Sequence, residues 1–425
     1  MLASLLLASG CSGDGSKDTT QDGGKPNTSH AAPSRVSHDP PRSFSLTPAI
    51  PLPDEAGTGK VTMGGTIASP LPVALYRTTA YAAPASLQAV DTTTGEVFAT
   101  VRPKQKALDN PDGFGSTNRT LPPAISQGSG MPLVIAPFLV SVPGSGTTPG
   151  HTAVEIVAMD AASGQPKWRA HATLPQWAHE PYGKLAGTII GAQNGIAVIQ
   201  VSDDAHGITY AVDIATHKII WQNDVAATAV SGTVVAGLSS QRSSDQQRLK
   251  GYDLTTGEPL WTTKNASYET TSGASASPNL ILFSGRDYGN GRQFAQLLDA
   301  RTGKVKSTIE GNQYGSSNVT CTYDGKSVTV CSGSSASGTR AFGVDAASAE
   351  LLWQLPDPAH NRVAPAVSTV RNGIVYGTTE NGPILLDART GADIEATPKL
   401  APAIVNGYTG IGLDGNSIVA YRTTG

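Results

Sequence analysis

The stretch GYDLTTGEPLW, from Gly251 to Trp261, decides the fold of this chain. It combines a strand end at Tyr252–Leu254, a tight turn at Thr255–Gly257 and a second strand that leads to Trp261. An aspartate before such a turn can accept hydrogen bonds from the backbone N–H groups that follow it. A glycine four residues after the aspartate supplies the positive φ that short hairpin loops commonly need. The stretch therefore predicts a β-hairpin with an aspartate-capped turn.

Related stretches recur along the chain and indicate a repeat protein. Successive aspartates of the repeat are separated by 69, 53, 40, 46, 46 and 42 positions. This period is that of four-stranded propeller blades, and the β-branched runs and glycine-rich turns around each copy disfavour a helical repeat. The repeat aspartates are Asp91, Asp160, Asp213, Asp253, Asp299, Asp345 and Asp387.

The turn glycine is present in five copies and replaced in two. His217 and Ala349 stand at the glycine position of their copies. Histidine visits the left-handed region more easily than alanine, so we expect the turn at Ala349 to have a different geometry. The repeat glycines are Gly95, Gly164, Gly257, Gly303 and Gly391.

A tryptophan follows the aspartate by eight residues in four copies. A large flat side chain at a fixed repeat position suits the gap between neighbouring blades. Ala99, Ser307 and Glu395 occupy this position in the other three copies, which predicts uneven packing between blades. The repeat tryptophans are Trp168, Trp221, Trp261 and Trp353.

The pattern A-x-D-x-x-T-G-x-x-x-W resembles the repeat of the pyrroloquinoline-quinone-like β-propellers, from about Val73 to the C-terminus. That superfamily includes quinoprotein alcohol dehydrogenases and the propeller lipoprotein of the outer-membrane β-barrel assembly machinery. The resemblance implies an all-β propeller of four-stranded antiparallel blades. Strands at Ala403–Tyr421 look like half a blade, which strands before Asp91 would complete, so that the N- and C-terminal strands close the ring. We expect seven blades; eight is the alternative if the ending YRTTG forms another repeat turn.

The N-terminal sequence MLASLLLASGC resembles a bacterial lipoprotein signal that ends at Cys11 as the lipidated residue. It lacks a basic n-region, and its apolar run is short. Residues 12–45 follow as a segment poor in large apolar residues, which predicts a disordered tether. The expected organisation is a signal peptide at 1–11, the tether at 12–45 and the propeller at 46–425. This organisation predicts a monomer outside the cytoplasm, held to the cell membrane by a lipid anchor.

Cys321 and Cys331 flank two alternating strands joined by a turn at Asp324–Gly325. Facing strands bring two such sulfurs within reach, and an exported location favours a disulfide. The alternative is a pair of unpaired thiols in the core.

Composition and motifs limit the function classes. The net charge is −3, which gives no reason to expect a nucleic-acid partner, and no apolar run is long enough for a transmembrane helix. Quinoprotein enzymes of the resembled superfamily use pyrroloquinoline quinone, a calcium ion, a catalytic aspartate and often two adjacent cysteines. This chain has no adjacent cysteines, and none of its residues matches the calcium ligands or the catalytic aspartate. We therefore assign no catalytic, metal-binding or cofactor-binding residue.

Of three segments outside the repeat, one is a candidate for binding. His171 and His179 surround Trp177 in a segment that we expect to be a loop between blades, without metal-ligand spacing. The acidic pair Asp203–Asp204 is expected to be solvated. Residues 104–130 predict a loop-like insertion on one face of the propeller, where binding residues tend to lie.

Two function classes remain open. The first is a non-catalytic propeller outside the cytoplasmic membrane that binds or scaffolds another envelope protein. The alternative is an oxidoreductase that depends on pyrroloquinoline quinone and calcium and has a degenerate signature. The first class is favoured because the chain has no adjacent cysteines and because turns and blade packing already account for the repeat residues.

Overall fold

The computed structural model describes residues 35–53, 71–108, 122–126, 130–179, 181, 185–239, 246–264, 272–287, 292–309, 319–335, 338–395, 398–415 and 417–425. These residues belong to one compact unit, Arg35–Gly425. The unit begins before the boundary expected at residue 46. Cys11 and most of the expected tether lie outside the described residues.

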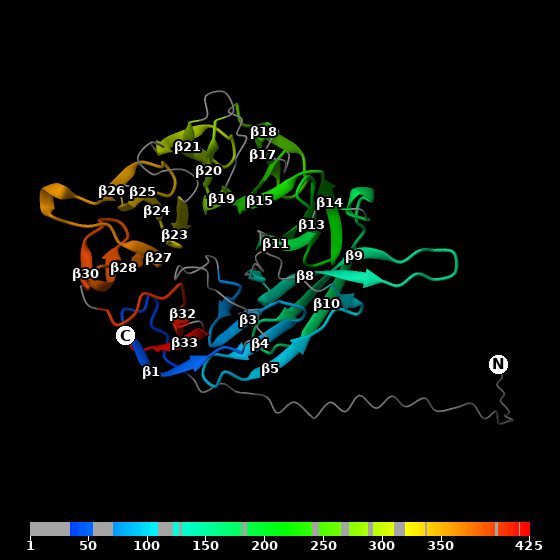
Figure 1. Cartoon of the computed structure of the whole chain (residues 1–425), viewed down its shortest axis with the longest axis horizontal. Coiled ribbons are helices and arrows are strands. Elements are labelled where there is room, and N and C mark those ends of the chain that lie inside the picture. The colour runs from blue at the N-terminus through cyan, green and yellow to red at the C-terminus, as the bar shows by residue number, and fades with distance from the viewer. Residues whose placement is uncertain are drawn as a thin grey trace, which may run out of the picture. The chain divides into compact units, whose positions relative to one another are not determined.

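The described strands form eight antiparallel sheets, each a blade of a propeller (Figure 1). The strands of blades 1 to 4 are β2 (Ala74–Tyr76), β3 (Thr79–Ala82), β4 (Leu87–Asp91) and β5 (Val97–Val101); β6 (Lys106–Ala107), β7 (Ala124–Ser126), β8 (Leu133–Val142), β9 (His151–Asp160) and β10 (Pro166–Ala172); β11 (Ala186–Gln193), β12 (Ile196–Ser202), β13 (Gly207–Asp213) and β14 (Lys218–Asn223); and β15 (Ala226–Ser231), β16 (Val234–Leu238), β17 (Leu249–Asp253) and β18 (Pro259–Thr262).

The remaining strands complete the ring. Those of blades 5 to 8 are β19 (Ser272–Ser277), β20 (Leu280–Arg286), β21 (Gln293–Asp299) and β22 (Val305–Ile309); β23 (Thr320–Tyr323), β24 (Val328–Ser335), β25 (Gly338–Asp345) and β26 (Leu351–Leu355); β27 (Ala366–Arg371), β28 (Ile374–Thr379), β29 (Gly382–Asp387) and β30 (Asp393–Glu395); and β31 (Ile404–Val405), β32 (Thr409–Asp414), β33 (Ser417–Thr423) and β1 (Phe44–Pro51). Within blades 1 to 7 the chain runs from the innermost strand outwards.

The all-β propeller and its closure by the two chain ends are confirmed, and the number of blades is eight, the alternative count. Strand β1 pairs with β33 and supplies the outer strand of blade 8, as Figure 1 shows where β1, in blue, lies beside β33, in red. The strands before Asp91 do not complete that blade, because they form blade 1 together with β5. The ending YRTTG forms no further turn, since Tyr421 and Arg422 lie within β33. Closure removes two sheet edges that would otherwise be exposed.

Apolar side chains gather between blades. The middle strands are buried on both faces, as in β12, where only the last residue is partly exposed. The buried residues form eight clusters, and each spans two neighbouring blades, including one between blade 8 and blade 1 around Ile411 and Val90. Every blade is therefore held mainly by its two neighbours.

The expected insertion at 104–130 contributes to the sheet of blade 2. Its strands β6 and β7 both pair with β8, where the other blades have a single innermost strand. The buried Glu155 carboxylate accepts hydrogen bonds from the backbone N–H of Lys104 at 2.8 Å and from Arg169 at 2.7 Å, so it anchors the start of this segment. The two described parts of the segment therefore belong to the sheet of blade 2. Most of its centre lies outside the described residues.

The first described residues fasten the chain to blades 7 and 8. The Asp39 carboxylate accepts hydrogen bonds from Arg371 at 2.7 and 2.6 Å and from the Asn372 amide at 2.8 Å. The Tyr376 hydroxyl donates to the Pro41 carbonyl at 2.6 Å. Partial burial opposes ionisation of Asp39, but the hydrogen bonds and charge of Arg371 outweigh it and lower the pKa of this carboxyl. None of the described helices is long and apolar enough to cross a membrane.

Candidate functional site

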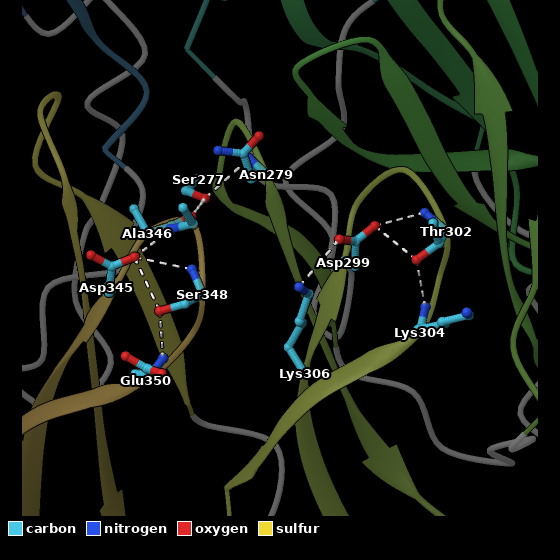
Figure 2. A network of polar contacts seen from close by, with 11 residues as sticks. Ser277, Asn279, Asp299, Thr302, Lys304, Lys306, Asp345, Ala346, Ser348 and Glu350 are labelled. Atoms are coloured by element: carbon cyan, nitrogen blue, oxygen red, sulfur yellow. Dashed lines mark hydrogen bonds and ion pairs between the residues drawn. The ribbon is translucent and has the colours of Figure 1, made fainter.

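The repeat aspartates cap the turns between the third and fourth strands. The Asp253 carboxylate accepts hydrogen bonds from the N–H groups of Thr255 at 2.8 Å and Thr256 at 2.9 Å. Figure 2 shows the corresponding turns at Asp299 and Asp345. The backbone hydrogen bond from Ser348 is the main cause that lowers the pKa of Asp345. The turn backbone thus occupies these carboxylates.

Three repeat tryptophans dock on the turn of the following blade. Trp221, Trp261 and Trp353 donate their indole N–H to the carbonyls of Leu254 (2.8 Å), Ala300 (2.9 Å) and Ala388 (2.7 Å), each of which directly follows a repeat aspartate. The turn glycine lies against the indole, and a Cβ built on Gly303 would stand 2.5 Å from a ring atom of Trp261. The glycine therefore provides both a positive φ and room for the ring.

The two copies without glycine follow the same backbone path. His217 and Ala349 have φ of 61° and 63°, so the different geometry that we expected at Ala349 does not occur. The Trp168 ring stacks on His217 with centroids 5.1 Å apart, and its indole N–H has no hydrogen-bond partner among the described residues. Ser307 takes the tryptophan position before Ala349, so no indole there requires a glycine.

Cys321 and Cys331 form a disulfide between directly opposed positions of β23 and β24. The Asp324 carboxylate accepts hydrogen bonds from the N–H groups of Lys326, Ser327 and Val328, which shapes the connecting loop. The bond lies at the inner edge of blade 6 and staples its innermost strand to the next one.

Antiparallel pairing places alternate connections at opposite faces of the ring. We call the face with the repeat turns the turn face. The link face carries the loops between second and third strands and the segments that join one blade to the next, such as residues 203–206 and 224–225. Binding residues on a rigid scaffold commonly lie in such loops.

The candidate site is a hollow of about 330 Å³ on the link face of blades 2 to 4, which we call the Trp177 hollow. Val225, Ala226 and Leu238 are its buried apolar lining residues, which we call its floor. Its other described lining residues are Pro175, Trp177, Ala205, His206, Gly207, Asp224 and Ser239.

An aromatic pair forms one wall of the hollow. Trp177 lies on the short 3-10 helix η2 (Gln176–His179), and its ring stacks on that of His206 with centroids 5.2 Å apart and planes 23° apart. The Asp203 carboxylate contacts His206 Nδ1 at 3.1 Å and accepts hydrogen bonds from the N–H groups of Ala205 and His206 at 2.7 and 2.6 Å. These hydrogen bonds from the buried Asp203 carboxylate hold the loop that carries His206. Solvent exposure, which we expected for both acidic residues, is found at Asp204 and not at Asp203.

The long hairpin of β8 and β9 extends beside this hollow. Figure 1 shows it projecting beyond the outline of the ring, and residues 143–150 at its tip are exposed. The rings of His151 on β9 and His179 on η2 lie 6.3 Å apart. His171, which we expected in a loop, lies in β10. The hairpin and the hollow together give this part of the link face an irregular surface.

Candidate carboxylate ligands for calcium are absent from the described parts of the inner strands. The innermost strands β2, β6, β7, β11, β15, β19, β23, β27 and β31 carry no aspartate or glutamate in their described lengths. Calcium prefers several oxygen ligands with carboxylates among them. No group of three or more histidine, cysteine, aspartate or glutamate residues suited to a metal occurs among the described residues.

The comparisons with known proteins agree with the repeat. A family model described as outer membrane protein assembly factor BamB matches residues 153–397. The chain belongs to this family of pyrroloquinoline-quinone-like repeat propellers. No curated protein matches it in sequence.

Several solved structures are distantly similar to this BamB-family chain. BamB from Moraxella catarrhalis is 13% identical, with a TM-score of 0.45 over 83% of this chain and 96% of that chain. The computationally designed Ika8 protein is 14% identical, with a TM-score of 0.45 over 83% and 92%. The quinohemoprotein alcohol dehydrogenase from Comamonas testosteroni is 13% identical, with a TM-score of 0.45 over 83% and 74%.

Proposed function

We propose that this BamB-family propeller is a non-catalytic module of the cell envelope that binds another envelope protein through its link face. The Trp177 hollow beside the β8–β9 hairpin carries the proposal. Aromatic side chains in partly buried hollows are typical centres of protein interfaces, and polar rims around them are common. The inner strands, which offer no carboxylate in their described part, give this proposal preference over a quinone-dependent oxidoreductase.

The envelope location rests on three observations. The family is named for an outer-membrane assembly factor. The sequence before Cys11 resembles a lipoprotein signal, and the disulfide of Cys321 and Cys331 suits an oxidising compartment. Metabolic labelling with a fatty acid tests the anchor: the wild type should incorporate label and Cys11→Ala should not. Equal labelling of both would exclude Cys11 as the lipidated residue.

Site-specific photo-cross-linking in cells tests the binding face. A cross-linking residue at Gln176 or Asp204, both exposed on the link face, should yield a discrete adduct with one partner protein. The matched controls are Thr255 and Arg301, exposed positions in repeat turns of the opposite face, which should yield none. Equal adducts from both faces, or none from the link face, would contradict the proposal.

A titration with pyrroloquinoline quinone tests the enzyme alternative. We expect a dissociation constant no tighter than about 1 mM, with or without calcium. Calcium-dependent binding at about 1 μM, together with dye-linked oxidation of an alcohol, would replace the proposed function with the oxidoreductase.

A further inference from the structure

We propose that the Trp177 hollow binds an arginine side chain presented by the partner protein. This inference rests on the proposed function and specifies the chemistry of the same site. It starts from the apolar, aromatic and charged residues that line the hollow.

The floor suits the aliphatic part of an arginine. Val225, Ala226 and Leu238 are apolar lining residues, against which the methylene groups of a long cationic side chain can pack. Trp177 forms part of the wall, and a guanidinium group is attracted to the face of an aromatic ring and stacks on it. A hollow of about 330 Å³ has room for one such side chain.

The charge of the lining is complementary to a cation. Asp224 is exposed, and its carboxylate accepts no hydrogen bond from a described residue. None of the described residues that line the hollow is a lysine or an arginine. His206 is paired with the buried Asp203, so this pair carries no net positive charge in either protonation state of the imidazole.

The negative potential of Asp224 extends into the surrounding structure. Burial raises the pKa of the Tyr210 hydroxyl to about 12, and the charge of Asp224 adds to this increase. The Tyr210 hydroxyl donates a hydrogen bond to the carbonyl of Thr173, which lies two residues before the lining residue Pro175. A cation in the hollow would meet the negative charge of the Asp224 carboxylate, for which no described residue competes through a hydrogen bond.

Arginine satisfies both features better than lysine. Its planar guanidinium can stack on an indole and donate two parallel hydrogen bonds to a carboxylate, whereas the lysine ammonium is a compact point charge. A neutral polar ligand such as a sugar could stack on Trp177 but would gain little from the charge of Asp224. An affinity that depends on the charge of the ligand therefore distinguishes an arginine side chain from a neutral sugar.

The test uses the full chain and the probe N-acetyl-L-arginine amide, with its neutral citrulline analogue as matched control. Binding is followed through the indole N–H resonances of the five tryptophans, and Trp177→Phe identifies the signal of Trp177. We expect the arginine probe to shift that signal and to bind at least about tenfold more tightly than the citrulline probe. Equal affinities, or no binding of the arginine probe, would overturn the inference. Binding of methyl glucoside with the same shifts would replace the arginine with a sugar.

Two variants locate the charge. Asp224→Asn should weaken arginine binding about fivefold and leave citrulline binding unchanged. Asp204→Asn removes a nearby exposed carboxylate that does not line the hollow. This variant should change the affinity for the arginine probe by less than about twofold. Equal effects of both variants would contradict a specific contact with Asp224. If cross-linking detects a link-face partner but the arginine probe fails, the proposed function stands and this inference falls; if the probe binds but no link-face adduct forms, the proposed function fails.

Discussion

A single methyl group added at Gly303 tests how neighbouring blades dock. Gly303 has a φ of +66°, and the indole of Trp261 from the preceding blade lies directly against it. An added Cβ would stand 2.5 Å from a ring atom of Trp261, far inside a normal contact. The Trp261 ring also donates to the Ala300 carbonyl at 2.9 Å, so it cannot withdraw without losing that hydrogen bond.

The expected cost of Gly303→Ala has three parts. Placing a side chain at positive φ costs about 1–2 kcal/mol. Overpacking against Trp261 adds about 1–3 kcal/mol, and loss of the indole hydrogen bond adds about 1 kcal/mol if the ring moves away. We therefore expect Gly303→Ala to lower the free energy of unfolding by about 3–6 kcal/mol. Gly195→Ala is the matched control, because Gly195 also has a positive φ, 77°, but nothing lies within 4 Å of its added Cβ.

Thermal unfolding distinguishes the two variants. The unfolding entropy of a domain of this size is about 0.8 kcal/mol/K, so an extra cost of about 2–4 kcal/mol corresponds to a melting temperature about 2–5 °C below that of the control. In a Trp261→Leu background the difference between the two variants should largely disappear, because the clash is removed. Equal melting temperatures of Gly303→Ala and Gly195→Ala in the natural background would refute the docking argument.

Three further predictions concern packing and the chain ends. Ser307→Trp should stabilise the protein when combined with Ala349→Gly but not alone, because Ala349 fills the space that an indole would need; equal melting temperatures of the single and double variants would oppose this. Removing residues 35–53 should expose the edge of β33 and cause aggregation or loss of cooperative melting, and a truncated protein that stays soluble and melts like the full chain would contradict closure by β1. Asp39→Asn should lower the free energy of unfolding by about 1 kcal/mol at pH 7. Because the folded pKa of Asp39 is lowered, its stabilisation is present above the unfolded pKa of about 4 and is lost as the pH falls through the folded value. The difference between Asp39→Asn and the wild type should therefore vanish in strong acid, and a pH-independent difference would exclude the ionised pair with Arg371.

The repeat predicted the propeller but not the position of its seam. The aspartate-capped turn has a local physical cause, so its recurrence along the chain could be recognised directly. Strand β1 lies outside any repeat copy, and β2 and β3 have only three and four residues. Blade 1 consequently resembled half a blade, which produced the count of seven.

The candidate site was only partly predictable, because it depends on contacts distant in sequence. The segment around Trp177 was recognised for His171 and His179, which the structure places in a strand and at the end of η2. The partner of Trp177 is His206, and no periodicity relates these two positions. The burial of Asp203 likewise follows from the loop that it caps, whereas an acidic pair in sequence usually indicates solvent exposure.

The repeat and the binding surface are nevertheless physically connected. Trp221 docks on the Leu254 carbonyl, and two residues later the Asn223 amide donates to the Gly257 carbonyl at 2.8 Å. Asn223 directly precedes Asp224, so the contact between blades 3 and 4 fixes the backbone that carries the charged rim of the Trp177 hollow. The same hollow takes its aromatic wall from the link between blades 2 and 3 and from blade 3 itself. Its geometry therefore depends on how three successive blades are rotated against one another. Trp168 on His217 and Trp221 on Gly257 help to set that rotation, and none of these four residues lines the hollow.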